Sequence, residues 1–263
     1  MIRLIMREVL EKTLKEALKK VEGKRCALMF TGGFDSVLLA LFMRQCGAQM
    51  TAMTVQFENF NPRTISEATL TAQKMGLDHH ILYVTLKEFL LAFKSLPLII
   101  YKPIFDLDLA VAYAALKKYD TSIAGKIIVS GMGSDQWFGN IPFKKDAIDE
   151  EIHQQAAKDQ GCKFIFPYLS NEMKLLSEKL SSEEKKDKKL LRELVPEESK
   201  KLVTELGITK RPEIQIPSQV RQLLIRIYGS KENIKNTKNE DEVLREIVER
   251  LWLKESGNKE HMV

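Results

Sequence analysis

An apolar segment that runs directly into two glycines, an acid and a hydroxyl residue most constrains the fold of this chain. Residues 25–30 have the composition of a buried strand, and the turn Thr31-Gly32-Gly33-Phe34-Asp35-Ser36 separates them from a second apolar segment, 37–42. Glycines let backbone N–H groups approach an anion closely, and the start of a helix adds positive partial charge. An acid at this point can hold a magnesium ion that bridges phosphates. The pattern therefore predicts a strand–turn–helix unit that binds pyrophosphate.

The first half of the chain alternates between strand and helix periodicity. Strands are expected at 25–30, 50–57, 80–84 and 126–130, and helices at 3–21, 36–45, 66–75, 86–94 and 107–118. This alternation predicts an α/β fold, with a parallel twisted sheet, helices on both faces and ligands at the carboxyl ends of the strands. A second glycine-rich turn, 131–135, follows the last expected strand. Both turns are therefore expected at the same edge of the sheet.

The second half of the chain is helical and more polar. Helices are expected at 168–180, 190–206, 218–228 and 242–253. The charged run Ser181–Lys189 is expected to form a loop or a solvated face. We predict an ATP-binding domain over residues 1–228 and a helical C-terminal extension over 229–263, packed on the same domain or partly flexible.

Composition indicates a cytoplasmic protein and gives no sign of a nucleic-acid or membrane partner. The net charge of +5 arises from 41 basic and 36 acidic residues, which are interspersed, so it does not indicate a nucleic-acid partner. Cys26, Cys46 and Cys162 are widely spaced and odd in number, as expected of reduced thiols. No apolar run is long enough to span a membrane, and the Lys/Glu-rich start does not resemble a signal peptide.

Several motifs, in order along the chain, resemble those of one enzyme family. The turn Thr31–Ser36 resembles the Ser-Gly-Gly-x-Asp-Ser loop of the ATP pyrophosphatases, or PP-loop family. Residues 130–139, Ser-Gly-Met-Gly-Ser-Asp-Gln-Trp-Phe-Gly, resemble the Ser-Gly-Glu-Gly-(Ala/Ser)-Asp-Glu-Leu-Phe-Gly signature of asparagine synthetases. Phe166-Pro167-Tyr168-Leu169 is similar to a Pro-Phe-Leu-Asp segment, and Lys189-Leu190-Leu191-Arg192-Glu193 with Val195-Pro196 is similar to a Lys-x-x-Leu-Arg-Glu...Pro segment. Residues 210–215 lie where that family carries a basic pyrophosphate-binding loop.

The resemblance implies an adenine nucleotide alpha hydrolase-like fold that uses ATP and Mg²⁺. It implies that a small carboxylate, such as aspartate, attacks the α-phosphorus of ATP to form an acyl-adenylate, from which an amine displaces AMP. The implied nucleotide-binding residues are Met29, Thr31, Gly32, Gly33, Asp35, Ser36, Val55, Ser130 and Gly131. Asp35 and Asp135 are the implied metal ligands, and Lys210 or Arg211 is the implied catalytic cation that neutralises the pyrophosphate.

Two residues depart from the pattern in the part of the motif that assists the amine. Met132 replaces a glutamate and can neither accept a proton nor orient ammonia, and Gln136 replaces the acid beside Asp135. The sequence begins Met1-Ile2-Arg3, without the nucleophilic cysteine of a glutaminase domain. The resemblance therefore implies a synthetase domain alone. Free ammonia, another amine or a separate glutaminase subunit would supply nitrogen, and a second copy of the chain is a further candidate partner.

Other interpretations of these residues stay open. The chain is an AMP-forming ligase, a PP-loop enzyme that modifies tRNA, or a nucleotide-binding homologue with reduced or no turnover. Gly32-Gly33 can be a plain strand-to-helix turn, and Asp35 a residue stabilised by the helix dipole. Lys210 and Arg211 can be surface charges. The pair His79-His80 is expected to be structural, and residues 137–138 to form core or pocket wall.

Overall fold

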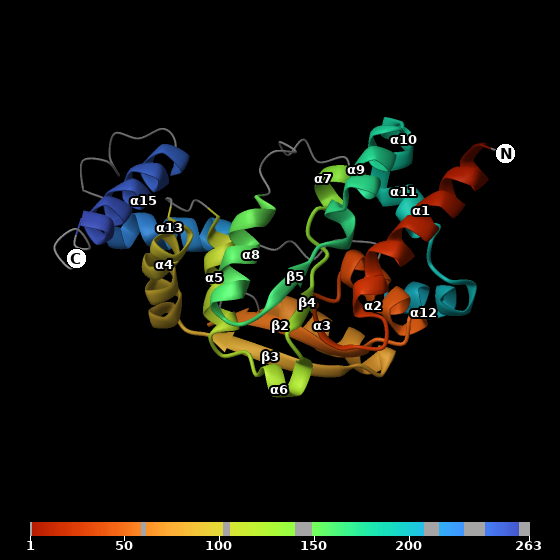
Figure 1. The fold of residues 1–263 in the computed structure, drawn as a ribbon, viewed down its shortest axis with the longest axis horizontal. Helices are drawn as coiled ribbons and strands as arrows, with labels where there is room; N and C mark the ends of the chain where they lie inside the picture. The colour runs from red at the N-terminus through yellow and green to blue at the C-terminus, as the bar shows by residue number, and fades with distance from the viewer. Residues whose placement is uncertain are drawn as a thin grey trace.

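The computed structural model describes residues 2–58, 62–101, 106–139, 149–207, 216–228 and 240–257. Its centre is a five-stranded sheet, all of whose strand pairs are parallel, in the order β3-β2-β1-β4-β5 (Figure 1). The strands are β1 (Arg25–Met29), β2 (Gln49–Phe57), β3 (Asp78–Val84), β4 (Ile127–Val129) and β5 (Lys163–Ile165). The predicted α/β fold with a parallel sheet is confirmed.

Strand β1 is the middle strand, and its position brings the two glycine-rich turns together. Cys26 of β1 is in register with Met50 of β2 on one side and with Ile127 of β4 on the other. Because the strands are parallel, the segments that leave the carboxyl ends of β1 and β4 start from neighbouring points on one edge. These segments carry the turns 31–36 and 131–135.

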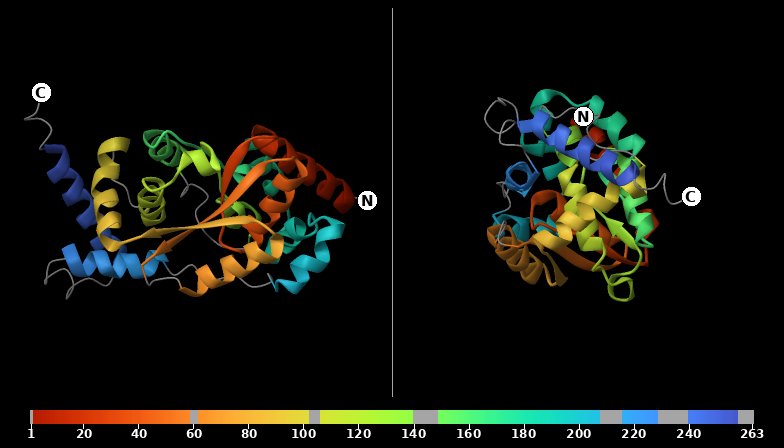
Figure 2. Two further views of the ribbon diagram at one scale, coloured as in Figure 1. Left: turned by 90° about the horizontal axis from the view of Figure 1, so that it is seen from below. Right: turned by 90° about the vertical axis from the view of Figure 1, so that its left-hand side faces the viewer.

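Helices cover both faces of the sheet (Figure 2). On one face α2 (Phe34–Gln45) and α3 (Pro62–Met75) pack against β1, β2 and β3, and α1 (Ile2–Leu18), continued by η1 (Lys19–Val21), packs on α2. On the other face lie α4 (Leu86–Ile100), α5 (Leu107–Leu116) and α8 (Glu150–Asp159), with α13 (Ile216–Tyr228) and α15 (Glu240–Gly257) outside them. Right-handed crossovers explain this division, since β1 to β2 and β4 to β5 advance in opposite directions along the sheet.

Short helices make up the rest of the described structure. They are α6 (Thr121–Ala124), α7 (Ser134–Phe138), η3 (Pro167–Leu169), α9 (Asn171–Glu178), α10 (Ser182–Lys185), η4 (Lys186–Lys188), α11 (Lys189–Arg192), η5 (Glu197–Ser199) and α12 (Lys200–Glu205). The predicted single helix at 190–206 is wrong, because Pro196 lacks an N–H donor and disfavours helical geometry in the residue before it. The predicted helix at 168–180 is also divided. Its second part, α9, begins after Ser170, whose Oγ accepts a hydrogen bond from the Met173 N–H at 3.3 Å.

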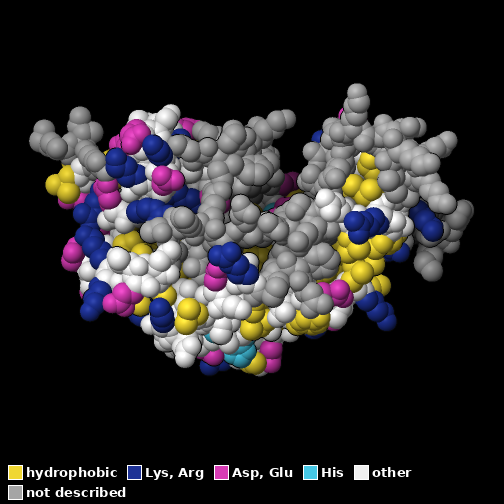
Figure 3. Space-filling view, turned by 180° about the vertical axis from the view of Figure 1, so that it is seen from behind, with side chains coloured by type: hydrophobic (Ala, Val, Ile, Leu, Met, Phe, Trp, Pro, Cys, Tyr) yellow, Lys and Arg dark blue, Asp and Glu magenta, His cyan; other side chains and the backbone are white. Residues whose placement is uncertain are grey.

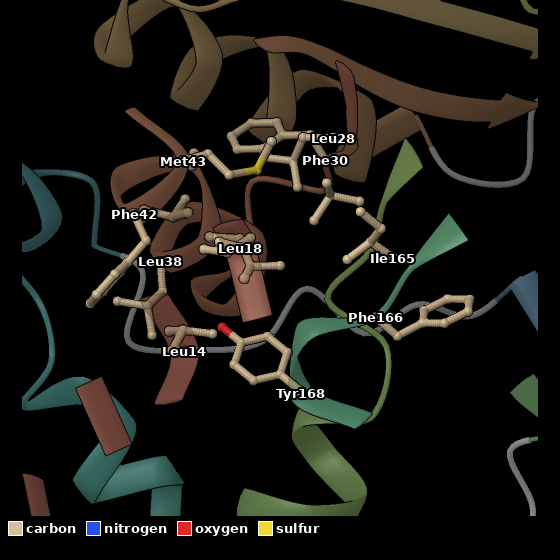
Figure 4. Close-up of a cluster of buried hydrophobic side chains, with 14 of the residues drawn as sticks. Leu14, Leu18, Leu28, Phe30, Leu38, Phe42, Met43, Ile165, Phe166 and Tyr168 are labelled. Carbon is tan, nitrogen blue, oxygen red and sulfur yellow. The ribbon is translucent and has the colours of Figure 1, made fainter. Parts of the chain in front are cut away.

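A buried cluster between α1, α2 and the sheet fixes the helix that follows the turn 31–36, which is predicted to bind phosphate and is called the phosphate turn below. Leu14 and Leu18 of α1 face Leu38 and Phe42 of α2, and Tyr168 from η3 lies beside them (Figure 4). All five side chains are buried. Burying each Leu or Phe side chain contributes about 1.5–3 kcal/mol. Packing therefore holds the N-terminus of α2 at the edge of the sheet.

A second buried cluster joins the C-terminal helices to the other face. Leu224 of α13 and Leu244 and Val248 of α15 pack with residues of α4 and α5, among them Phe89 and Tyr113. The predicted division at residue 228 stays a prediction.

The described surface carries charges of both signs. On the face drawn in Figure 3, Lys and Arg side chains lie among Asp and Glu side chains. No helix in the described ranges is long and apolar enough to cross a membrane.

Candidate active site

The hydroxyl groups of Thr31 and Ser36 make hydrogen bonds within the turn after β1. The N–H of Thr31 donates to Ser36 Oγ at 3.4 Å, and that of Gly33 donates to Thr31 Oγ1 at 3.3 Å. Ser36 Oγ in turn donates to the carbonyl of Gly33 at 3.0 Å, at the start of α2. The first two bonds are longer than the usual range for N–H···O hydrogen bonds. A phosphate oxygen can therefore replace the hydroxyl acceptors without breaking a strong bond.

Gly32 brings this turn against α3. Its φ is +71°, and a Cβ atom placed on it would lie 2.9 Å from the Cα of Ala68 and 3.2 Å from the carbonyl oxygen of Glu67. Both atoms belong to helix backbone and cannot move aside. The position therefore requires glycine for its conformation and for its close contact.

We expect Gly32→Ala to destabilise the protein more than Gly47→Ala, which provides a matched control. Gly47 has the same φ of +71°, but no atom lies within 4 Å of its added Cβ. Both variants incur the left-handed penalty of roughly 1–2 kcal/mol. Gly32→Ala adds overpacking against α3, which costs about 1–3 kcal/mol more. Urea unfolding of the two variants measures the difference, and equal losses would show that the contact with α3 is unimportant.

The turn after β4 packs directly on the first turn. A Cβ atom on Gly131 would lie 3.3 Å from the Cβ of Asp35, and one on Gly133, whose φ is +92°, would lie 2.1 Å from Leu169 Cδ2. Ser130 continues β4 by donating its N–H to the Ile165 carbonyl at 3.0 Å. These contacts place Ser130 and Gly131, two predicted nucleotide-binding residues, beside the phosphate turn.

A buried lysine joins the acids of the two turns. Lys188 Nζ lies 2.5 Å from Asp35 Oδ2 and 2.5 Å from Asp135 Oδ1, and it donates to Ser134 Oγ at 2.9 Å. The other carboxylate oxygen of Asp35, Oδ1, is buried and has no hydrogen-bond partner among the described residues. The two carboxylates thus share one ammonium group. The fold brings together the two acids that the sequence predicts as metal ligands.

The backbone that delivers this lysine has an unusual conformation. Asp187 and Lys188 both lie in the left-handed region, with φ values of 52° and 56°. For residues with a Cβ atom, each such conformation costs of order 1–3 kcal/mol and persists only where the surroundings hold it. The contacts of Lys188 with both acids therefore come at a conformational cost.

Tyr168 supports the acid side of the cluster. Its hydroxyl donates to the backbone carbonyl of Asp35 at 3.2 Å. Burial, and then the nearby charges of Asp35 and Asp135, raise the pKa of Tyr168 well above its ordinary value. The phenol therefore stays protonated at neutral pH and remains a donor.

Met29 and Val55 lie on neighbouring strands where the sequence predicts adenosine contacts. Met29 is the last residue of β1, whereas Val55 lies inside β2, in register with Leu82 of β3. Beside them Thr54 Oγ1 donates to the Phe30 carbonyl at 2.5 Å.

His79 supports the same edge of the sheet. Thr54 uses its only proton on the Phe30 carbonyl, so His79 Nε2, at 2.7 Å, must be the donor to Thr54 Oγ1. Burial, followed by the charge of His80, lowers the pKa of His79. The imidazole is therefore neutral at pH 7, in agreement with the predicted structural role.

Sequence analysis missed Lys188, which belongs to the run 181–189 that was expected to be solvated. That expectation is wrong for this residue, since Lys188 is only 7% exposed. The spacing Lys-x-x-Leu-Arg-Glu, counted back from Leu191, puts the motif lysine at position 188 and could have found it. Lys189 is instead largely exposed and lies 3.6 Å from Glu183.

The structure describes two of the four other predicted positions. Lys210 and Arg211 lie outside the described residues. Trp137 and Phe138 of α7 are buried, which confirms that they form core or pocket wall. Lys174 of α9 lies over the Trp137 ring at 5.9 Å.

The donor set of the site fits magnesium held jointly by protein and substrate. The described residues contain no group of three or more His, Cys, Asp or Glu side chains that could hold a metal. The site offers two carboxylates, Asp35 and Asp135, one of which has a buried oxygen without a partner. Mg²⁺ is usually bound by one or two carboxylates together with phosphate oxygens and water. The two acids therefore suit a magnesium ion that arrives with a nucleotide.

The parallel sheet, the glycine turn after β1 and the paired acids define a PP-loop ATP pyrophosphatase, an ATP-using class. The sequence pattern of one family, described as asparagine synthase, matches residues 6–254. The chain belongs to the asparagine synthase family.

Solved structures show a more distant likeness. A glutamine-dependent NAD⁺ synthetase from Acinetobacter baumannii is 13% identical over 94% of this chain, which spans 44% of that protein, with a TM-score of 0.46. The U34-tRNA thiolase NcsA from Methanococcus maripaludis is 15% identical over 93% of this chain and 80% of its own, with a TM-score of 0.39. The comparison with curated protein sequences gave no match.

Proposed function

We propose that this protein is an AMP-forming carbon–nitrogen ligase that adenylates a small carboxylate, with aspartate as the first candidate. Pyrophosphate leaves in that step, and ammonia or another amine then displaces AMP. The observation that carries the proposal is the cluster of Lys188 with Asp35 and Asp135, which lies between two glycine turns at one edge of the sheet. Membership of the asparagine synthase family supports the same reaction class.

The residues of the turns suit the departure of pyrophosphate. A carboxylate oxygen of the substrate forms a bond to the α-phosphorus, and the bond from that phosphorus to the oxygen that bridges to the β-phosphate breaks. Negative charge then builds up on the leaving group. The N–H groups of Thr31 and Gly33, the N-terminus of α2 and the ammonium of Lys188 offer positive charge at one place. Asp35 and Asp135 would hold Mg²⁺, which when bound neutralises phosphate charge. Lys210 or Arg211 stays the proposed second cation.

The amine half of the site lacks the acids of the family pattern. Met132 has a thioether where the pattern has a glutamate, and its N–H donates to Ser130 Oγ at 3.3 Å. Gln136 of α7 has an amide where the pattern has the acid beside Asp135. These two positions favour a second candidate, a nucleotide-binding homologue with reduced turnover.

ATP–[³²P]pyrophosphate exchange over a panel of small carboxylates tests the proposal. We expect exchange that depends on one carboxylate and on Mg²⁺. AMP release that depends on tRNA would instead support a tRNA-modifying enzyme. Binding of ATP without AMP formation under any of these conditions would support the homologue with reduced turnover.

We expect Met132→Glu to raise the rate of amide formation from ammonia. A positioned general base contributes typically 10²–10⁴-fold, so a gain of about tenfold or more is expected even from an imperfectly placed carboxylate. The matched control is Met132→Gln, because the glutamine side chain is as long as that of glutamate but cannot accept a proton. Amide yield in the presence of the activating carboxylate is the measurement. Equal rates in the two variants would show that the missing glutamate does not limit the reaction.

The remaining partners and the compartment follow from the same proposal. A small carboxylate, an amine or ammonia and a separate glutaminase subunit are the proposed partners, and a homodimer is the proposed assembly. The three cysteines are free thiols, which supports a cytoplasmic location.

A further inference from the structure

Arg192 contacts Asp187 and Phe34, the residues that immediately precede Lys188 and Asp35. Its Nε donates to the carbonyl of Asp187 at 2.7 Å, and its guanidinium carbon lies 4.5 Å from the centre of the Phe34 ring. Asp187 immediately precedes Lys188, and Phe34 immediately precedes Asp35. One side chain thus links the turn that supplies the cation to the turn that supplies the anion.

The contact with Asp187 acts where the backbone most needs support. The Asp187 carbonyl belongs to the peptide that joins two consecutive left-handed residues. A side chain with a Cβ atom disfavours this conformation, so neighbouring contacts must hold the peptide in place. The Lys188 side chain is flexible, and its direction depends on this peptide.

The contact with Phe34 provides a fixed anchor. Phe34 is the first residue of α2 and is only 7% exposed. Its ring is held by the core cluster around α1 and α2. A guanidinium offers a planar face to a ring while it donates through Nε, whereas a lysine ammonium has no planar face and reproduces this contact only in part.

We propose that Arg192 is a positioning residue that holds Lys188 between Asp35 and Asp135 in the arrangement that binds pyrophosphate. This inference rests on the proposed function, because it takes pyrophosphate as the ligand of the cluster. Arg192 acts through Lys188, so its effect on pyrophosphate affinity depends on the presence of that lysine.

A double-mutant cycle on the full chain tests this dependence, with calorimetric titration of inorganic pyrophosphate in the presence of Mg²⁺. Loss of a charge-assisted hydrogen bond predicts about 10- to 100-fold weaker binding in Lys188→Met. We expect Arg192→Gln to weaken binding about 10-fold and to have no further effect, within about twofold, in the Lys188→Met background. Additive losses, or wild-type affinity in Arg192→Gln, would overturn the inference.

Two further variants separate positioning from charge and from folding. Arg192→Lys keeps the positive charge but loses the planar guanidinium. This variant should fold, and it should bind pyrophosphate more weakly than the wild type does. Wild-type affinity in this variant would also overturn the inference. Arg25→Gln is the control, since Arg25 Nη1 donates to the Ser122 carbonyl at 2.7 Å at the start of β1, and its affinity should be unchanged. If the wild type fails to bind pyrophosphate, or Lys188→Met binds it normally, the proposed function fails rather than the role of Arg192.

Discussion

Lys188→Met is expected to lower the free energy of unfolding by about 3–5 kcal/mol, because removal of one partner leaves buried charge uncompensated. The two acids would face each other without the ammonium that now lies 2.5 Å from each. Urea unfolding at neutral pH measures the loss. Added Mg²⁺ should restore part of the stability of the variant, since a ligand that binds only the folded state stabilises it by mass action.

Lys189→Met provides a control one residue away. The Lys189 side chain is 45% exposed. Exposed ion pairs contribute about 0–1 kcal/mol to the free energy of unfolding. A small effect in both variants, or a Lys188→Met protein that is indifferent to Mg²⁺, would contradict the view that the acids need a cation.

Asp135→Asn is expected to lower carboxylate-dependent pyrophosphate exchange by about 10²–10³-fold, the usual loss when one group that stabilises developing charge is removed. Asparagine keeps the shape of the side chain and an oxygen that can accept from Lys188, but it removes the charge that suits a metal. The fold should therefore survive. Manganese titration in the presence of ATP, followed by electron paramagnetic resonance, measures the metal affinity of the nucleotide complex without requiring turnover.

The control for this substitution is Asp120→Asn. Asp120 is the N-cap of α6, where its side chain accepts from the Ser122 N–H, and asparagine caps helices as well as aspartate does. Exchange in this variant should match that of the wild type. Retention of both exchange and manganese affinity in Asp135→Asn would exclude Asp135 as a metal ligand.

The local sequence pattern was sufficient to predict which edge of the sheet carries the two glycine-rich turns. The turns 31–36 and 131–135 each show an apolar strand, glycines and an acid in direct succession, and a parallel sheet brings such turns to one edge. The strand β5 was missed, because its three residues are too few to show alternation and, unlike the equally short β4, they do not lead into a glycine-rich turn. Pro196 marks a helix break that the periodicity of 190–206 concealed.

The motif spacing marks the position of Lys188, but local composition does not indicate that its side chain is buried. Residues 181–189 form a charged run, and nothing in the run distinguishes one lysine from the next. The partner that buries Lys188 is Asp35, 153 residues away in sequence. The contact depends on how η4 packs against α7, which is a property of the assembled fold.

The distribution of the cluster along the chain has a consequence for protein synthesis. Asp35 and Asp135 both precede Lys188 in the sequence, so the cation that pairs with them belongs to a segment made later. Synthesis proceeds from the N-terminus, so the turns of β1 and β4 can emerge from the ribosome while their two charges still repel each other. The shared ammonium reaches the two acids only after residue 188 has been added and has docked.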